Sequence, residues 1–107
     1  MLKKRLRLRG SEVEEVLKDG RSVRSPHMQV KWLGGQEPLR SAAIVAKSVA
    51  RKATSRNALR RAMYRAIASA TPPLPHARAL FFLRMVPKEP PSAILKDEVA
   101  FLISRII

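Results

Sequence analysis

The stretch AKSVARKATSRNALRRAMYR, residues 46–65, decides how this chain folds. It predicts a basic loop followed by a basic helix that ends near Ala70. Thr54 or Ser55 can cap the helix start, because a hydroxyl oxygen accepts a hydrogen bond from a free amide of the first turn. Helical spacing then separates two faces. The expected buried stripe is Leu59, Ala62, Met63, Ala66 and Ile67. The expected solvent face carries Arg56, Asn57, Arg60, Arg61, Tyr64 and Arg65.

The charge around this helix has one sign. No acid occurs from Pro38 to Lys88. The basic residues in this interval are Arg40, Lys47, Arg51, Lys52, Arg56, Arg60, Arg61, Arg65, Arg78, Arg84 and Lys88. Like charges one helical turn apart repel, so the arrangement costs stability unless a polyanion neutralises it. A solvated basic face without a ligand is the alternative interpretation.

Composition narrows the class of protein. The chain has 107 residues, 46% hydrophobic, with a net charge of +14 and no cysteine. This length suits one modest core, and the charge indicates nucleic acid or an anionic membrane surface as partner. No apolar run approaches the ~20 residues that span a bilayer, and the basic N-terminus lacks the apolar segment of a secretory signal. We therefore expect a cytoplasmic protein, which the absence of cysteine fits.

The rest of the chain predicts a small α+β domain. A basic arm (1–10) precedes a short helix with a capping box of Ser11 and Glu14, and Gly20 ends this helix in the left-handed conformation. Alternation predicts strands from His27 to Leu33 and from Arg40 to about Lys47, with a third short strand near 47–50 left open. After a proline-rich connector (71–76), the apolar run 80–86 predicts a central strand. A last helix, capped by Ser92, buries Leu95, Val99, Leu102 and Ile106, with Ile94, Phe101 and Ile103 widening the stripe.

Catalysis by the protein itself is not indicated. His27 and His76 have no partner at metal-ligand spacing, and Ser41, Ser48 and Ser55 lack a nearby base and acid. No glycine loop of the phosphate-binding kind occurs. Arginine forks match phosphate oxygens, so nucleic-acid binding is favoured. Tyr64 is expected to seal the helix edge rather than stack on a base, and Trp32 to lie in the core.

Residues 47–61 resemble the signature of the bacterial ribonuclease P protein component, which has a basic loop followed by Arg-Asn-x-x-Arg-Arg on a helix. Weaker similarity extends over nearly the whole chain. The resemblance implies one RNA-binding domain over residues 1–107, a small sandwich of a mixed four-stranded sheet and three helices in the order αβββαβα. It also implies a fold like domain 2 of ribosomal protein S5, with a left-handed βαβ crossover.

The resemblance also implies the function. The family's protein binds a catalytic RNA, and the pair removes the 5′ leader of precursor tRNA. The RNA carries the chemistry with bound Mg²⁺, so the protein is an accessory subunit without catalytic residues or a metal site. Contacts to the RNA subunit are implied for Lys47, Arg51, Lys52, Arg56, Asn57, Arg60, Arg61 and Arg65. A cleft for the single-stranded leader is implied at Val13, Leu17, Met28 and Val30. A purely structural RNA-binding protein, of ribosomal or chaperone type, and a DNA-binding module are the alternatives.

Overall fold

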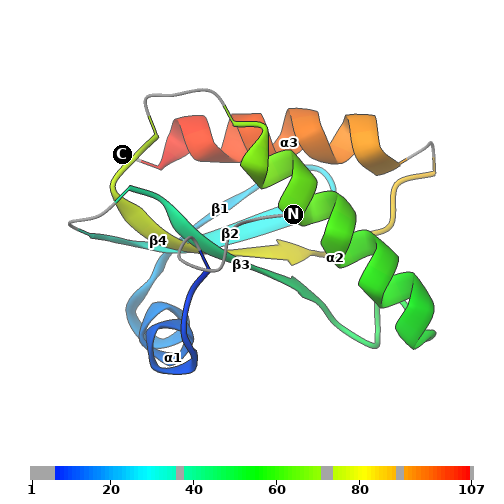
Figure 1. The fold of residues 1–107 in the computed structure, drawn as a ribbon, viewed down its shortest axis with the longest axis horizontal. Coiled ribbons are helices and arrows are strands. Elements are labelled where there is room, and N and C mark those ends of the chain that lie inside the picture. The colour runs from blue at the N-terminus through cyan, green and yellow to red at the C-terminus, as the bar shows by residue number, and fades with distance from the viewer. Residues whose placement is uncertain (1–6, 36–37, 71–73, 89–90, 107) are drawn as a thin grey trace.

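The computed structural model describes residues 7–35, 38–70, 74–88 and 91–106. Within these ranges the chain forms three helices and a four-stranded mixed sheet, which confirms the predicted α+β class and the order αβββαβα (Figure 1). The elements are α1 (Gly10–Asp19), β1 (Arg21–Arg24), β2 (Met28–Gly34), β3 (Arg40–Val45), α2 (Ala53–Ala68), β4 (Ala77–Leu83) and α3 (Pro91–Arg105).

The strands lie in the order β1-β2-β4-β3. β1 and β4 pair antiparallel with β2, and β3 pairs parallel with β4. Since α2 lies between β3 and β4 in the chain, the three form a βαβ unit. The left hand of this crossover and the likeness to ribosomal protein S5 remain predictions of the resemblance.

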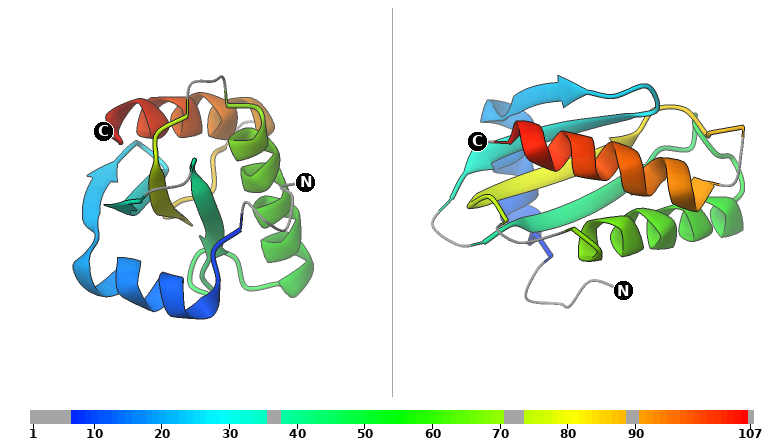
Figure 2. Two further views of the ribbon diagram at one scale, coloured as in Figure 1. Left: turned by 60° about the vertical axis from the view of Figure 1, so that its left-hand side comes forward. Right: turned by 90° about the horizontal axis from the view of Figure 1, so that it is seen from above.

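The two faces of the sheet are covered by different helices. α2 and α3 lie over one face, and α1 lies against the other (Figures 1 and 2). The main core fills the layer under α2 and α3, where alternate residues of β2, β3 and β4 meet the buried stripes of the two helices. Trp32 belongs to this core, as expected. On the α1 side, Val16 and Leu80 are also fully buried.

β1 is a strand that the sequence did not locate. Its four residues are mostly exposed and show no hydrophobic alternation. β1 is a strand because it pairs antiparallel with β2, where Val23 lies opposite Val30. The short strand considered near 47–50 is wrong, because Val49 and Ala50 both donate backbone hydrogen bonds to the Ala46 carbonyl in a tight turn.

β4 begins and ends three residues earlier than predicted. Gly34 pairs with Ala77 and Met28 pairs with Leu83, so the length of β2 sets the limits of β4. Covering on both faces accounts for the nearly continuous apolar run of this central strand. Met85 and Val86, which were assigned to the strand, are exposed beyond its end.

The start of α1 differs from the predicted capping box. The helix begins at Gly10, and the backbone N–H of Arg9 donates to Oε1 of Glu12 over 3.1 Å. Ser11 and Glu14 therefore lie inside the helix. Only the glutamate half of the motif is present, two residues earlier than predicted, because the guanidinium of Arg9 at the N-cap cannot accept a hydrogen bond from an amide.

Gly20 ends α1 for a different reason from the one predicted. Its φ of −69° is extended, not left-handed. A Cβ at this position would stand 2.4 Å from the carbonyl oxygen of Val16. Glycine is needed here because the backbone passes too close to the last turn of the helix for any side chain.

The ends of α2 also differ from the prediction. The helix starts at Ala53, with Lys52 at the N-cap and no side-chain cap, and it ends at Ala68 rather than Ala70. Thr54 and Ser55 are exposed inside the first turn. Thr54 and Ser55 favour an N-cap position, but the tight turn at Ala46 precedes them, and the helix begins at Ala53.

α3 confirms its predicted buried stripe of Leu95, Val99, Leu102 and Ile106. It begins at Pro91, where the missing N–H is harmless at the first helical position. The side chain of Ser92 lies outside the described residues, and so do 71–73 of the connector. Phe101 was expected to widen the stripe but is 48% exposed, so that part is wrong.

Candidate nucleic-acid interface

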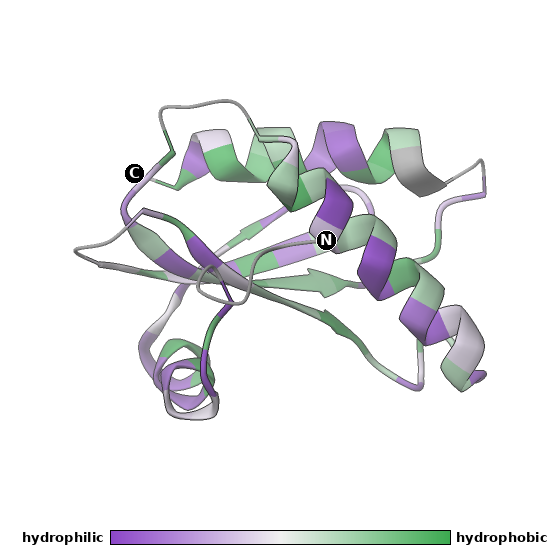
Figure 3. Ribbon diagram, in the orientation of Figure 1, coloured by the Kyte–Doolittle hydropathy of each residue, from purple (hydrophilic) through white to green (hydrophobic). Residues whose placement is uncertain are grey.

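α2 separates apolar and basic residues as predicted. Its buried residues are Leu59, Ala62, Met63, Ala66 and Ile67. Asn57, Arg61 and Arg65 are exposed, and Arg56 and Arg60 are partly exposed. Polar bands recur along the helix between apolar ones (Figure 3). We call the side carrying Arg56, Asn57, Arg60, Arg61 and Arg65 the basic face.

No carboxylate of the described residues neutralises the arginines of the basic face. Arg56 donates to the carbonyls of Ala50 and Arg51 over 3.1 and 2.7 Å, and Arg60 donates to Oδ1 of Asn57. In the described ranges, no carboxylate forms an ion pair with Arg56, Arg60 or Arg61; the ion pairs there join Glu12 to Arg40, Glu15 to Arg78, and Glu98 to His27. The positive charge of the helix therefore remains available to an external anion.

The basic loop continues this surface beyond the helix start. Lys47, Arg51 and Lys52 are exposed, and the first turn of α2 contains no acid. The helix dipole is positive at this end, so the cations do not complement it. The tight turn at Ala46 and the two hydrogen bonds of Arg56 hold the loop against the helix. The combined field favours a negatively charged ligand.

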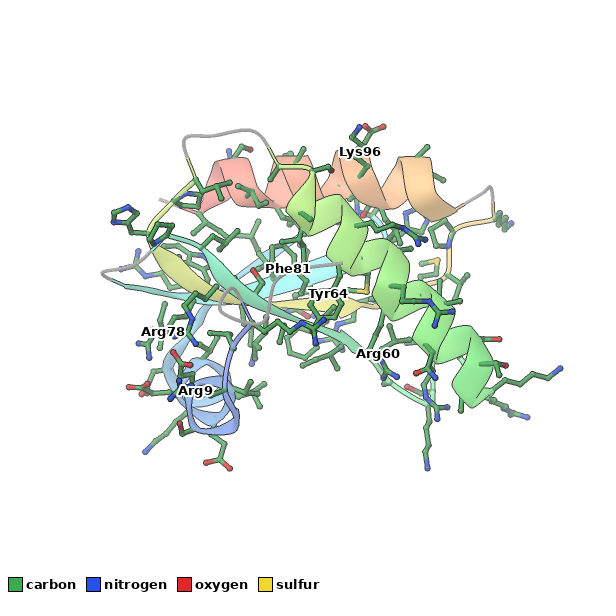
Figure 4. All side chains as sticks on the ribbon, viewed as in Figure 1. Arg9, Arg60, Tyr64, Arg78, Phe81 and Lys96 are labelled. Carbon is green, nitrogen blue, oxygen red and sulfur yellow. The ribbon has the colours of Figure 1, made fainter. Side chains whose placement is uncertain are left out.

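A hollow of about 370 Å³ opens beside the basic face. It is lined by Arg7, Asn57, Arg60, Arg61 and Tyr64. Figure 4 shows Arg60 and Tyr64 on the same side of α2. The Tyr64 hydroxyl accepts a hydrogen bond from the Ala43 N–H over 3.1 Å, which confirms that this ring seals the helix edge. The sequence placed Arg7 in a basic arm but gave no sign that it meets α2.

The structure contradicts the predicted leader cleft at two of its four residues, and the assignment of Val13 and Leu17 to a leader site stays a prediction. Val13 is partly exposed and Leu17 is 43% exposed on α1. Met28 and Val30, however, are fully buried in the core under α2 and α3. They lie on the opposite face of the sheet from α1 and cannot line an open cleft, so this part of the prediction is wrong.

The β2 residues on the α1 side are instead Gln29, Lys31 and Leu33, one position away. Alternation revealed that the strand has two faces but could not say which helix covers each. On the same side, Arg84 donates to Oε1 of Gln29, whose amide donates to Ser22 Oγ. The Arg84 guanidinium also lies 5.4 Å from the centre of the Phe82 ring. At this end of β2 and β4, the α1 side of the sheet therefore carries polar and aromatic side chains.

Glu98 makes a pairing that the sequence did not reveal. Its carboxylate accepts hydrogen bonds from the Ser25 hydroxyl, the His27 N–H at 2.7 Å and His27 Nδ1 at 2.6 Å. Burial raises the pKa of Glu98, but the hydrogen bonds from Ser25 and His27 outweigh it and hold the pKa below its usual value. Ser25 and His27 both bind the same carboxylate, so the cluster fastens α3 to the β1–β2 turn.

Neither a metal-binding cluster nor a membrane-spanning helix is found in the part of the chain that the structure describes. The described residues contain no group of three or more His, Cys, Asp or Glu side chains that could hold a metal ion. None of the described helices is long and apolar enough to span a bilayer.

The fold and this surface define a small basic α+β protein in which α2 presents arginines that no carboxylate of the described residues pairs with. The family described as Ribonuclease P matches residues 2–107. The chain therefore belongs to the ribonuclease P protein family, as the sequence resemblance predicted.

Solved structures of similar fold agree. A mutant of the Staphylococcus aureus RNase P protein with defective mRNA degradation activity has a TM-score of 0.80 at 17% identity, covering 97% of this chain and 92% of that one. The RNase P protein from Thermotoga maritima has a TM-score of 0.74 at 20% identity, covering 94% and 97%. A comparison with curated protein sequences finds no match.

Proposed function

We propose that this chain, as one RNA-binding domain, is the protein subunit of a tRNA-processing ribonuclease P. Its basic face and basic loop bind the catalytic RNA subunit, and the α1 side of the sheet binds the 5′ leader of precursor tRNA. The RNA carries out the cleavage, with Mg²⁺ held mainly by the RNA. Membership of the family supports the assignment.

The observation that carries the proposal is the uncompensated charge of α2. Like charges lie one helical turn apart at Arg56 and Arg60 and again at Arg61 and Arg65, so they repel. Arg56, Arg60 and Arg61 have no carboxylate partner in the described residues. Each arginine that contacts a phosphate releases a counterion, so the logarithm of the RNA-binding constant falls linearly with the logarithm of the salt concentration. The number of contacts can therefore be measured from that slope.

The first test is reconstitution with a bacterial ribonuclease P RNA at low Mg²⁺. The wild-type chain is expected to increase cleavage of precursor tRNA over the RNA alone. Arg61→Ala should weaken binding to the RNA subunit and reduce the salt slope by roughly one. Lys96→Ala is the matched control, since Lys96 is an exposed cation on the outer side of α3 (Figure 4).

The outcomes separate the candidates. Binding of the RNA subunit without any gain in cleavage would reject the proposal and favour a structural RNA-binding protein. Equal competition by duplex DNA would favour a DNA-binding module. Circular dichroism should show that Arg61→Ala remains folded, because the change relieves repulsion on an exposed face.

The leader site needs its own test. Leu17→Asp places a negative charge at an exposed position of α1. It should weaken binding of precursor tRNA to the reconstituted enzyme but leave mature tRNA, which has no leader, unaffected. If both tRNAs lose affinity equally, the α1 side is not the leader site.

A further inference from the structure

The hollow beside α2 is built from two parts of the chain that are far apart in sequence. α2 supplies Asn57, Arg60, Arg61 and Tyr64, and the N-terminal arm supplies Arg7. The volume of about 370 Å³ is many times the roughly 30 Å³ that a water molecule occupies in the liquid. Three guanidinium groups and an amide line this space, and none of the described residues brings a carboxylate into it. Its charge and shape suit a phosphate group.

The backbone at Arg7 and Leu8 is fixed against β3, the edge strand of the sheet. Arg7 forms a parallel bridge with Ser41, and the Leu8 N–H donates to the Ser41 carbonyl over 3.1 Å. Arg40 Nη2 also donates to the Arg7 carbonyl over 3.1 Å. These bonds fix where the Arg7 side chain leaves the backbone but do not determine where its guanidinium points.

The Tyr64 ring orients that guanidinium. The Cζ atom of Arg7 lies 5.2 Å from the ring centre, within the range of a cation–π interaction. The ring is itself held, because its hydroxyl accepts the Ala43 N–H of the same edge strand. Nε of Arg7 is buried without an acceptor. A cation held in this way beside Arg60 and Arg61 is repelled by both, so it favours a bound anion.

We propose that Tyr64 is a positioning residue, which holds Arg7 against the basic face so that the arm and α2 bind one phosphate of the RNA together. The inference rests on the proposed function and goes beyond it, because it assigns an uncharged residue a part in phosphate binding. Tyr64 does not itself contact the phosphate in this arrangement. Its effect on RNA affinity passes through Arg7.

The test is a double-mutant cycle in the full chain, with affinity for the RNA subunit measured over a series of salt concentrations. Arg7→Ala should bind the RNA roughly tenfold more weakly, because it removes one hydrogen bond to a charged group. It should also lower the salt slope by about one. Tyr64→Leu should produce the same two changes although it removes no charge. The double variant should be no worse than either single variant.

Tyr64→Phe and Lys96→Ala are the matched controls. Tyr64→Phe keeps the ring and loses only the hydrogen bond to Ala43, so it should retain most of the affinity and the full slope. Lys96→Ala should match the wild type. Additive losses in the double variant, or an unchanged salt slope in Tyr64→Leu, would overturn the inference. A wild-type chain that does not bind the RNA subunit at all would instead overturn the proposed function.

A measurement in the wild-type chain keeps the inference testable even if Tyr64→Leu does not fold. The Nε–H resonance of Arg7, assigned by its loss in Arg7→Ala, should show an upfield ring-current shift in the free protein and move when an RNA fragment is added. Inorganic phosphate at the same phosphate concentration should leave it unmoved. Absence of the ring-current shift would refute the role of Tyr64, and an equal response to inorganic phosphate would refute the assignment to nucleic acid.

Discussion

Glu98 offers the sharpest test of how the fold is held together. It is 8% exposed on α3 and accepts three hydrogen bonds from Ser25 and His27 at the β1–β2 turn. The change Glu98→Gln keeps the shape of the side chain but removes its charge. Its effect on the free energy of unfolding should therefore report the charge-assisted part of these bonds.

The magnitude follows from the three bonds. Hydrogen bonds to charged groups contribute about 1.5–3 kcal/mol each, against about 0.5–1.5 for neutral pairs. Glu98→Gln keeps one acceptor oxygen, whose bonds weaken by about 1 kcal/mol each, and replaces the other by an NH₂ group. Less the relief of burying a charge, the expected loss is roughly 1–3 kcal/mol. Glu98→Ala removes every acceptor and should cost roughly 3–5 kcal/mol, as for a broken buried pair.

The pH dependence has a definite sign. The pKa of Glu98 is lowered in the folded state from its usual 4.5. Its stabilising contribution is therefore complete above pH 4.5 and is lost as the pH falls through the lowered value. The gap in stability between wild type and Glu98→Gln should be constant near neutral pH and should close in acid below pH 4.5.

Urea denaturation followed by circular dichroism, at pH 7 and through the acid range, measures both effects. Glu15→Gln is the control, because its ion pair with Arg78 leaves the glutamate side chain 55% exposed. That pair should contribute less than about 1 kcal/mol. Equal urea midpoints for wild type and Glu98→Gln at pH 7 would refute the reasoning, as would a gap that persists in acid.

The other predictions concern the scaffold of the basic face and the end of α1. Leu59→Ala should lower stability by roughly 2–5 kcal/mol in urea denaturation, because it leaves a cavity under α2; an unchanged midpoint would contradict the assigned face. Gly20→Ala should cost roughly 1–3 kcal/mol by thermal unfolding, since its Cβ would meet the Val16 carbonyl oxygen, whereas Gly10→Ala, with open space around it, should cost no stability. Arg56→Met removes the nitrogen that donates to both loop carbonyls, so proteolysis of the basic loop should become faster than in wild type.

Helical periodicity identified the parts of the fold and site that depend on local geometry. The buried stripe of α2 and the four buried apolar residues predicted for the last helix are confirmed, because residues three and four apart share a helix face whatever they pack against. The free charge of α2 followed from the acid-free interval that surrounds it. The family was recognised from the same stretch, and comparison of the whole chain confirmed it.

The first and last residues of several helices and strands depend on contacts with other elements, which the sequence does not reveal. β1 exists because β2 pairs with it, and β4 is limited by the length of β2. The caps expected at Ser11 and Ser55 were wrong, because the adjoining turns fixed the first residue of each helix.

The sequence by itself therefore determined which helix faces are apolar and which are charged. Only the tertiary structure decided that Met28 and Val30 face the core rather than the α1 side, and that Glu98 meets His27. It alone brought Arg7 over Tyr64. The physical reason is range: side-chain periodicity is set by bonds along the chain, whereas contacts between distant residues depend on which surfaces the sheet and helices bury together.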